Sequence, residues 1–302
     1  MKCLFQFIIY HFASIIFHMI DAHIHVVPPN LPGVGPLSPG LRASVENVGR
    51  VVREQMHAAG MTHAAAMGCL DGGPDDPLGV SRTLQICREV KGLYAIGIAD
   101  PTRHDEEHLH RAEEQIQSGR IVALKAYLGY THYFASDRGY VPYYELAAKY
   151  RLPFFFHTGD TYSPYGKLKY AHPLTVDEVA VDFPKVNFVL CHVGNPWTLD
   201  AAEVIYKNMN VWADLSGLVV GSEEEIDADA NSQNRRDLIE RIRAAFRYAE
   251  RPNRFIYGSD WPLAPMPAYA ELIHEMIPIE FHELVFAENA RTLFGERMRS
   301  KL

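Results

Sequence analysis

The sequence has 302 residues, of which 48% are hydrophobic and 22% charged, the composition of a soluble globular protein with one large domain or two smaller ones. Its formal net charge is −8 and its basic residues form no stripe, so we expect no nucleic-acid partner. The cysteines (Cys3, Cys69, Cys87 and Cys191) form no C-x-x-C pair, which argues against a disulfide framework or a zinc finger and favours the cytoplasm.

Residues 4–20 are almost entirely apolar and follow Lys2, so a signal peptide or membrane anchor is one interpretation. Against it, His11 and His18 interrupt the run, no A-x-A cleavage site follows, and the end of the run is needed for a strand. Met19 is an alternative start. We predict an apolar extension over residues 1–18 and a folded unit over residues 19–302, with a membrane role disfavoured and the anchor or signal left open.

The first predicted strand, residues 19–27, ends in His23-Ile24-His25. Residues i and i+2 of a strand point to the same side, so the two imidazoles should face one point, as a metal site requires. A second His-x-His, formed by His108 and His110, lies in a charged segment typical of a helix. On a helix, i and i+2 do not share a face, and we interpret this second pair as solvated surface.

Apolar runs typical of strands then alternate, to the end of the chain, with segments whose apolar residues have helical spacing. The predicted strands cover residues 19–27, 61–69, 93–99, 119–128, 152–157, 186–192, 211–215 and 254–257. The predicted helices cover residues 44–60, 80–91, 105–118, 141–150, 173–183, 199–207 and 235–250, with two or three closing helices and an acidic loop at 223–229. Such runs are typical of parallel strands buried on both faces, and their order predicts a single α/β domain, a (β/α)8 TIM barrel. A doubly wound open sheet is the alternative, but no G-x-G-x-x-G follows the first strand.

Ionisable side chains lie at the ends of five predicted strands, where barrels of this type carry their chemistry. They are His23, His25, Lys125, His157, His192 and Asp260. Imidazoles and a carboxylate suit zinc or a similar divalent metal, and three histidines with one aspartate leave a position for water. A metal lowers the pKa of such a water to about 7, and the aspartate can accept its proton. A further histidine could stabilise a developing oxyanion.

Five motifs in order carry a family resemblance: Ile20-Asp21-Ala22-His23-Ile24-His25, Ala123-Leu124-Lys125-Ala126-Tyr127, Pro153-Phe154-Phe155-Phe156-His157-Thr158-Gly159, Val189-Leu190-Cys191-His192-Val193-Gly194 and Tyr257-Gly258-Ser259-Asp260-Trp261-Pro262. The chain resembles the amidohydrolase superfamily, and within it the amidohydrolase-2 group, over roughly residues 20–295. That group includes lactonases and the aminocarboxymuconate-semialdehyde and resorcylate decarboxylases. The resemblance implies that His23, His25, His157 and Asp260 hold one divalent metal, zinc or alternatively manganese, with His192 as the catalytic histidine.

The resemblance leaves two interpretations of Lys125. In some relatives a carboxylated lysine on the fourth strand bridges two metals, and under that interpretation His192 also becomes a ligand. The alternative, which we favour, is a fixed cation that binds a substrate carboxylate or pairs with an acid.

Aromatic residues that follow strand ends are candidates for a substrate pocket: Tyr127, Tyr130, Trp197 and Trp261, with Tyr133 and Tyr162. Asp160 is either a partner that orients the site or a turn residue. The leading hypothesis is a metal-dependent hydrolase of a small ester, lactone or amide. The alternatives are a metal-dependent non-oxidative decarboxylase on a similar site and, more remotely, a non-catalytic binding barrel. A homo-oligomer is left open.

Overall fold

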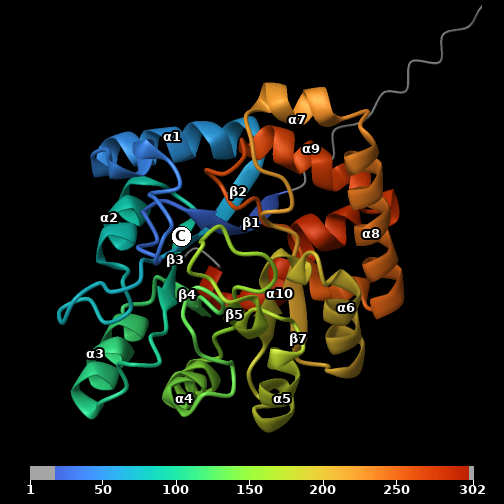
Figure 1. Ribbon diagram of the computed structural model, residues 1–302. Coiled ribbons are helices and arrows are strands. Elements are labelled where there is room, and N and C mark those ends of the chain that lie inside the picture. Colours follow the sequence, from blue (N-terminus) through green and yellow to red (C-terminus); the bar gives the residue numbers. More distant parts are fainter. Residues whose placement is uncertain (1–17, 299–302) are drawn as a thin grey trace, which may run out of the picture.

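The computed structural model describes residues 18–298, in which eight parallel strands pair in chain order and helices surround them (Figure 1). The strands are β1 Met19–His25, β2 Met61–Met67, β3 Leu93–Ile98, β4 Ile121–Ala126, β5 Phe154–Phe156, β6 Phe188–Leu190, β7 Val211–Asp214 and β8 Phe255–Ile256. The two ends of the sheet meet, because the Ala22 N–H donates to the Tyr257 carbonyl at 3.0 Å and Ile24 pairs with Trp261. The TIM-barrel prediction is confirmed.

The main helices fall close to the predicted ranges. They are α1 Val45–Ala58, α2 Ser81–Glu89, α3 Glu106–Gln117, α4 Val141–Tyr150, α5 Thr175–Asp182, α6 Thr198–Lys207, α7 Glu223–Asp229, α8 Gln233–Ala249, α9 Met266–Met276 and α10 Asn289–Phe294. Helix α1 illustrates the local cause: the Ser44 side chain caps its first turn, and Val48, Val52 and Met56 recur at i+4 on its buried face.

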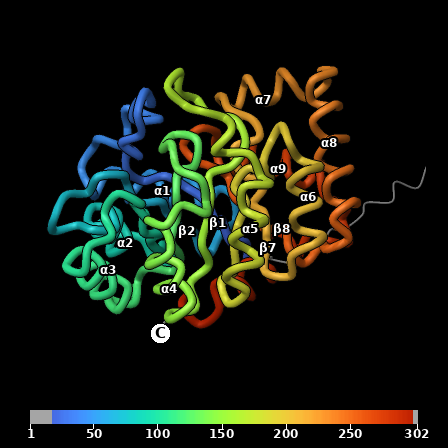
Figure 2. The backbone as a smooth tube through the Cα atoms, turned by 60° about the horizontal axis from the view of Figure 1, so that its bottom comes forward, coloured from blue at the N-terminus to red at the C-terminus, as the bar shows by residue number. Residues whose placement is uncertain are grey.

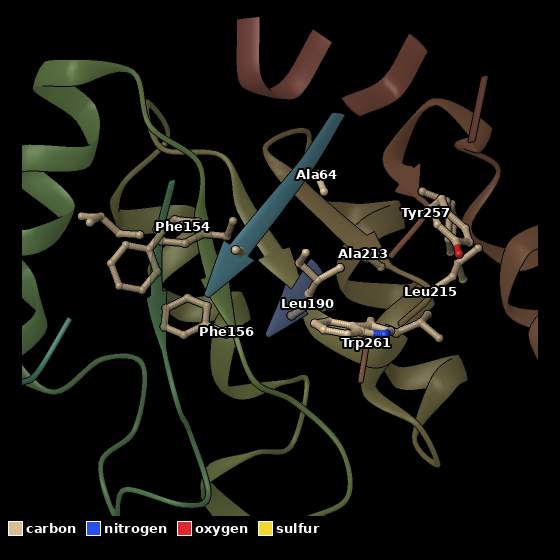
Figure 3. Packing of buried hydrophobic residues seen from close by; sticks show 14 of the residues in the cluster. Ala64, Phe154, Phe156, Leu190, Ala213, Leu215, Tyr257 and Trp261 are labelled. Atoms are coloured by element: carbon tan, nitrogen blue, oxygen red, sulfur yellow. The ribbon is translucent and has the colours of Figure 1, made fainter. Parts of the chain in front are cut away.

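Two apolar layers hold the barrel. The outer layer lies between strands and helices and includes Phe154, Phe156 and Trp261 (Figure 3). The inner layer fills the barrel and includes Phe155. Helix α10 contributes to this inner layer through Leu293 and Phe294, and the Phe155 and Phe294 rings stack with centroids 6.1 Å apart. The closing helix therefore helps to fill the barrel interior.

Strand β1 contains an irregularity that matters for the site. Ile20 and Ala22 belong to the inner layer, so strict alternation would turn residue 24, not 23, towards the interior. The pairing of β1 with β2 shifts register between Asp21 and Ile24, and Ile24 packs in the outer layer. This bulge-like shift aims His23 and His25 inward, as bulges next to active sites commonly do.

Two surface predictions are wrong. His108 is buried, and its Nε2 lies 2.8 Å from the Tyr143 hydroxyl, so only His110 of that pair is solvated. The buried face of α3 includes His108, and a tyrosine on α4 supplies a hydrogen-bond partner for its Nε2. Residues 223–229 form helix α7 rather than a loop, because Ser222 and Glu225 make a reciprocal capping box at its first turn.

Within residues 18–298, no helix combines the length and apolar composition that crossing a membrane requires. The apolar extension predicted for residues 1–18, with its signal or anchor alternative, falls almost wholly on residues 1–17, which lie outside the described residues.

Candidate functional site

The predicted site residues meet at the carboxyl ends of the strands. His23 and His25 end β1, Lys125 lies in β4, and His157 follows β5 directly. His192 lies in the short turn Cys191–Gly194 after β6, and Asp260 follows β8. Figure 2 shows β1 and β8 in the middle part of the molecule, and the hydrogen bond from the Ala22 N–H to the Tyr257 carbonyl brings the first and last of these residues together.

Asp260 is the point on which the imidazoles converge. Its Oδ1 lies 3.4 Å from His23 Nε2 and 3.2 Å from His25 Nε2, and its Oδ2 lies 3.9 Å from His192 Nδ1. Donor atoms of His23, His192 and Asp260 lie within 4.8 Å of one another. Within the described part of the chain, the buried Oδ1 accepts no hydrogen bond of good geometry. A buried acceptor left unpaired is costly, and this arrangement fits a cation.

The protonation states also suit a cation. Burial lowers the pKa of His23 to about 4 and lowers those of His25 and His157, so these imidazoles are neutral at pH 7 and have a free lone pair. Burial raises the pKa of Asp260, but His23, His25 and His192 outweigh it and hold that pKa well below its usual range. Two neutral imidazoles and a carboxylate meeting at one point are a ligand set for a divalent metal.

His157 contacts His192, which in turn faces Asp260. Its Nε2 lies 2.8 Å from the Asp160 carbonyl oxygen, so Nε2–H donates there and the Nδ1 lone pair faces His192 Nε2 at 3.1 Å. Asp160 therefore orients the site through its backbone oxygen, while its side chain accepts from the Thr161 N–H at 2.7 Å. His192 and Asp260 both have positive φ, of 60° and 59°, a costly conformation that functional sites tend to hold.

Lys125 is almost fully buried beneath this cluster. Its Nζ lies 3.3 Å from His23 Nε2, 3.3 Å from Cys191 Sγ, and 5.1 Å from the centroid of the Tyr127 ring. The lysine thus faces the same imidazole nitrogen that faces Asp260.

A carboxylate at the end of β7, not among the residues predicted from the sequence, belongs to the site. Asp214 is fully buried, and its Oδ2 lies 2.9 Å from His23 Nδ1. Its Oδ1 accepts the backbone N–H groups of His192 and Ser216, at 2.8 and 3.1 Å. Burial raises the pKa of Asp214, but His23 outweighs it and the net pKa is below the usual range. Asp214 ends an apolar strand just as the predicted residues do, and that signal was available.

Asp21, to which the sequence assigned no role, lies under the same cluster. Its Oδ1 accepts the N–H groups of His23 at 3.1 Å and Ser259 at 3.0 Å, tying the end of β1 to the loop after β8. Burial raises the pKa of Asp21 to about 7.

A cavity of about 190 Å³ opens above the cluster. Its lining is His23, His25, Pro29, Leu31, Val34, Leu37, Lys125, Tyr127, Tyr130, His157, Asp160, Tyr162, His192, Asn195, Gly217, Leu218, Asp260 and Leu263. The cavity thus includes Tyr127, Tyr130 and Tyr162 of the aromatic candidates, whereas Tyr133 is exposed and does not line it. Trp197 instead packs beside the His172 ring, with centroids 5.0 Å apart, and Trp261 packs in the outer apolar layer.

The amidohydrolase-2 family model, described as amidohydrolase, matches residues 20–295. No curated protein matches the chain significantly. Among solved structures, an uncharacterised TIM-barrel protein from Bordetella bronchiseptica aligns with a TM-score of 0.64 at 19% identity, over 92% of this chain and 99% of that one. An amidohydrolase from Burkholderia multivorans with bound zinc aligns at 0.63 and 15%, over 91% and 98%. The 2,6-dihydroxybenzoate decarboxylase from Rhizobium aligns at 0.61 and 14%, over 91% and 98%.

Proposed function

Because the chain belongs to the amidohydrolase family, we propose that it is a metal-dependent hydrolase of a small ester, lactone or amide. The observation that carries the proposal is the convergence of His23 Nε2 and His25 Nε2 on the buried Asp260 Oδ1, at 3.4 and 3.2 Å. A carboxylate in that position is ionised at neutral pH, and its Oδ1, which has no hydrogen-bond partner among the described residues, can accept a proton.

We propose that His23, His25, His157 and Asp260 hold one divalent metal, with zinc favoured by the ligand types and manganese as the alternative. His157 would take part through Nδ1, the atom that faces His192 in this structure. When bound, the metal would polarise the substrate carbonyl and lower the pKa of water. The position of His192 between Asp260 and His157 supports a second version, in which His192 completes the ligand set and Lys125, carboxylated, bridges two metals.

The chain's own residues supply the remaining steps. Asp260 accepts a proton from the attacking water while the water oxygen bonds to the carbonyl carbon. Asp260 then returns that proton to the leaving oxygen or nitrogen. His192 lines the cavity and donates to the carbonyl oxygen as negative charge develops on it. Asp214 holds the His23 ring through Nδ1 and so keeps Nε2 directed at Asp260.

A decarboxylase is the second candidate function. The observation that favours it is Lys125, a buried cation at the base of the cavity that would attract a substrate carboxylate. The fold likeness to the Rhizobium decarboxylase, with a TM-score of 0.61, is compatible with either reaction.

The deciding experiment incubates the zinc- or manganese-loaded full chain with a panel of lactones and esters and, separately, with hydroxybenzoates and muconates. We expect acid formation from the first panel. Carbon dioxide release with no acid formation would reject the hydrolase in favour of the decarboxylase. Lactone binding without turnover by the metal-loaded protein would favour a binding barrel.

The site assignment has its own test. We expect His157→Ala to lose both bound metal and activity, while His110→Ala, a change at an exposed histidine on α3, preserves both. A His157→Ala variant with unchanged metal content and activity would contradict the site as drawn.

A further inference from the structure

One side of the cavity is an apolar wall, which we define as Leu31, Val34, Tyr127 and Tyr130. These residues form a cluster of their own, with Ile98 and Leu70 behind them, apart from the two layers that hold the barrel. The four residues of the apolar wall also line the cavity. The Tyr127 and Tyr130 rings meet edge to face, with centroids 6.4 Å apart, and Tyr130 also packs on His157 at 4.7 Å. The wall therefore reaches the candidate metal ligands directly.

The protein's own charges in the lining, leaving aside that of the proposed metal, disfavour an anionic substrate. Within the described part of the chain, Lys125 is the one lysine or arginine in the lining, and its Nζ is already directed at His23 and Cys191. Asp160 and Asp260 contribute carboxylates to the same lining. A substrate carboxylate loses its hydration on entering such a cavity and is best compensated by a bidentate arginine, which this lining lacks.

Apart from His25 Nδ1 and Asp260 Oδ1 of the metal cluster, the unsatisfied polar groups of the cavity lining are neutral among the described residues. The Tyr127 hydroxyl and Asn195 Oδ1 are buried and find no hydrogen-bond partner among residues 18–298. A tyrosine hydroxyl keeps its proton at neutral pH, so the Tyr127 hydroxyl can donate. A buried donor without a partner favours a ligand that brings an acceptor oxygen.

We propose that the site takes an uncharged lactone or ester whose apolar ring packs on the apolar wall and whose oxygen accepts a hydrogen bond from Tyr127. This inference rests on the proposed hydrolase function and narrows its substrate class. It places substrates that carry a carboxylate, including those of a decarboxylase, at a disadvantage in this cavity.

The test measures binding separately from turnover. The zinc-loaded full chain is titrated calorimetrically with hydrocarbostyril, the slowly reacting lactam analogue of dihydrocoumarin, and with the same molecule bearing a ring carboxylate. Piperidone, the lactam ring without its fused benzene, is the third probe. We expect hydrocarbostyril to bind at least about 10-fold more tightly than either, from burial of its benzene ring and the absence of an unpaired charge. Equal or tighter binding of the carboxylated analogue would overturn the proposal.

Val34 offers a matched pair of variants, because it lines the cavity and is only half-buried on the wall. Val34→Arg should shift the affinity ratio towards the carboxylated analogue by about 10-fold, while Val34→Gln, polar but neutral, should not. An unchanged ratio in Val34→Arg would reject the wall as the contact surface. Tyr127→Phe should weaken the binding of hydrocarbostyril by about 2- to 10-fold at constant metal content, because one hydrogen bond is lost. Unchanged binding would reject the contact between Tyr127 and the ligand.

Dihydrocoumarin turnover separates the two proposals. Hydrolysis combined with a preference for anionic probes rejects the substrate class and keeps the hydrolase. Preferred binding of hydrocarbostyril without hydrolysis of dihydrocoumarin keeps the neutral ligand class and rejects the hydrolase.

Discussion

The carboxylate of Asp214 lies 2.9 Å from Nδ1 of His23, and both side chains are fully buried. The ring nitrogen that faces Asp214 must carry the proton, which leaves the Nε2 lone pair for the cluster at Asp260. The end of β7 thus sets the tautomer and orientation of a histidine at the end of β1.

Replacing Asp214 with asparagine should weaken metal binding by about 10- to 100-fold, because the tautomer of His23 is no longer fixed. Competition with a chelator of known affinity measures the change. Asp75→Asn, at a fully exposed carboxylate, is the matched control and should bind as the wild type does. Wild-type affinity in Asp214→Asn would mean that His23 is oriented by other contacts.

Asp260→Asn should lower kcat by about 10²- to 10⁴-fold, because the amide cannot accept a proton from water. Steady-state assays on the hydrolysed lactone, with metal content measured in parallel, separate loss of the base from loss of the ion. Activity within threefold of the wild type at equal metal content would remove Asp260 from the proton-transfer step.

The histidine pair formed by His274, in the last turn of α9, and His282 should make stability depend on pH. His274 and His282 face each other with their Nδ1 atoms 3.0 Å apart, and His282 Nε2 donates to the Ile277 carbonyl. Burial, then His282, lowers the pKa of His274 to about 4 from 6.5. Between these two values the unfolded chain binds more protons than the folded protein. The stability that depends on a neutral His274 is therefore fully present above pH 6.5 and is lost as pH falls towards 4.

We expect His274→Gln to lose less stability than the wild type between pH 7 and pH 5 in denaturant unfolding of the metal-free protein. His110→Gln, on the exposed face of α3, should keep the wild-type slope. Identical slopes for wild type and His274→Gln would show that the pair does not titrate in this window.

Phe294→Ala should destabilise the fold by about 3–5 kcal/mol, because it opens a cavity where α10 meets the interior of the barrel. Phe294 is buried and stacks on Phe155 at 6.1 Å. Leu199→Ala, at a side chain 53% exposed, should change stability by less than about 0.5 kcal/mol. Thermal unfolding of the two variants side by side provides the comparison, and similar melting temperatures would contradict a packed barrel floor.

Periodicity and strand order were sufficient to predict the barrel, because buried parallel strands are apolar throughout and each one is followed by a helix with its own apolar face. They also located most of the cluster, since strand ends of a barrel share one rim. The direction in which His23 and His25 point was not predictable, because a register shift in β1 overrides the alternation that Ile20 and Ala22 follow.

The remaining misses have the same kind of cause. His108 is buried because Tyr143, on another helix, supplies a partner that no local pattern reveals. Trp261 packs into the outer layer rather than the cavity because Ile24 pairs with it. Asp214 was visible as a strand-end carboxylate, but its role depends on the distance to His23, which only the closed barrel defines.

The contacts that close the barrel join chain segments more than two hundred residues apart, and three of the four candidate ligands, His23, His25 and Asp260, come from the same two segments, β1 and the loop after β8. A bound ion would therefore link the first and last strands of the barrel at the point where the barrel closes. Its removal would lower the barrier to parting these strands, and backbone amides at that point would exchange with solvent sooner than those between β3 and β4. The ion would thus contribute to the integrity of the barrel as well as to its chemistry.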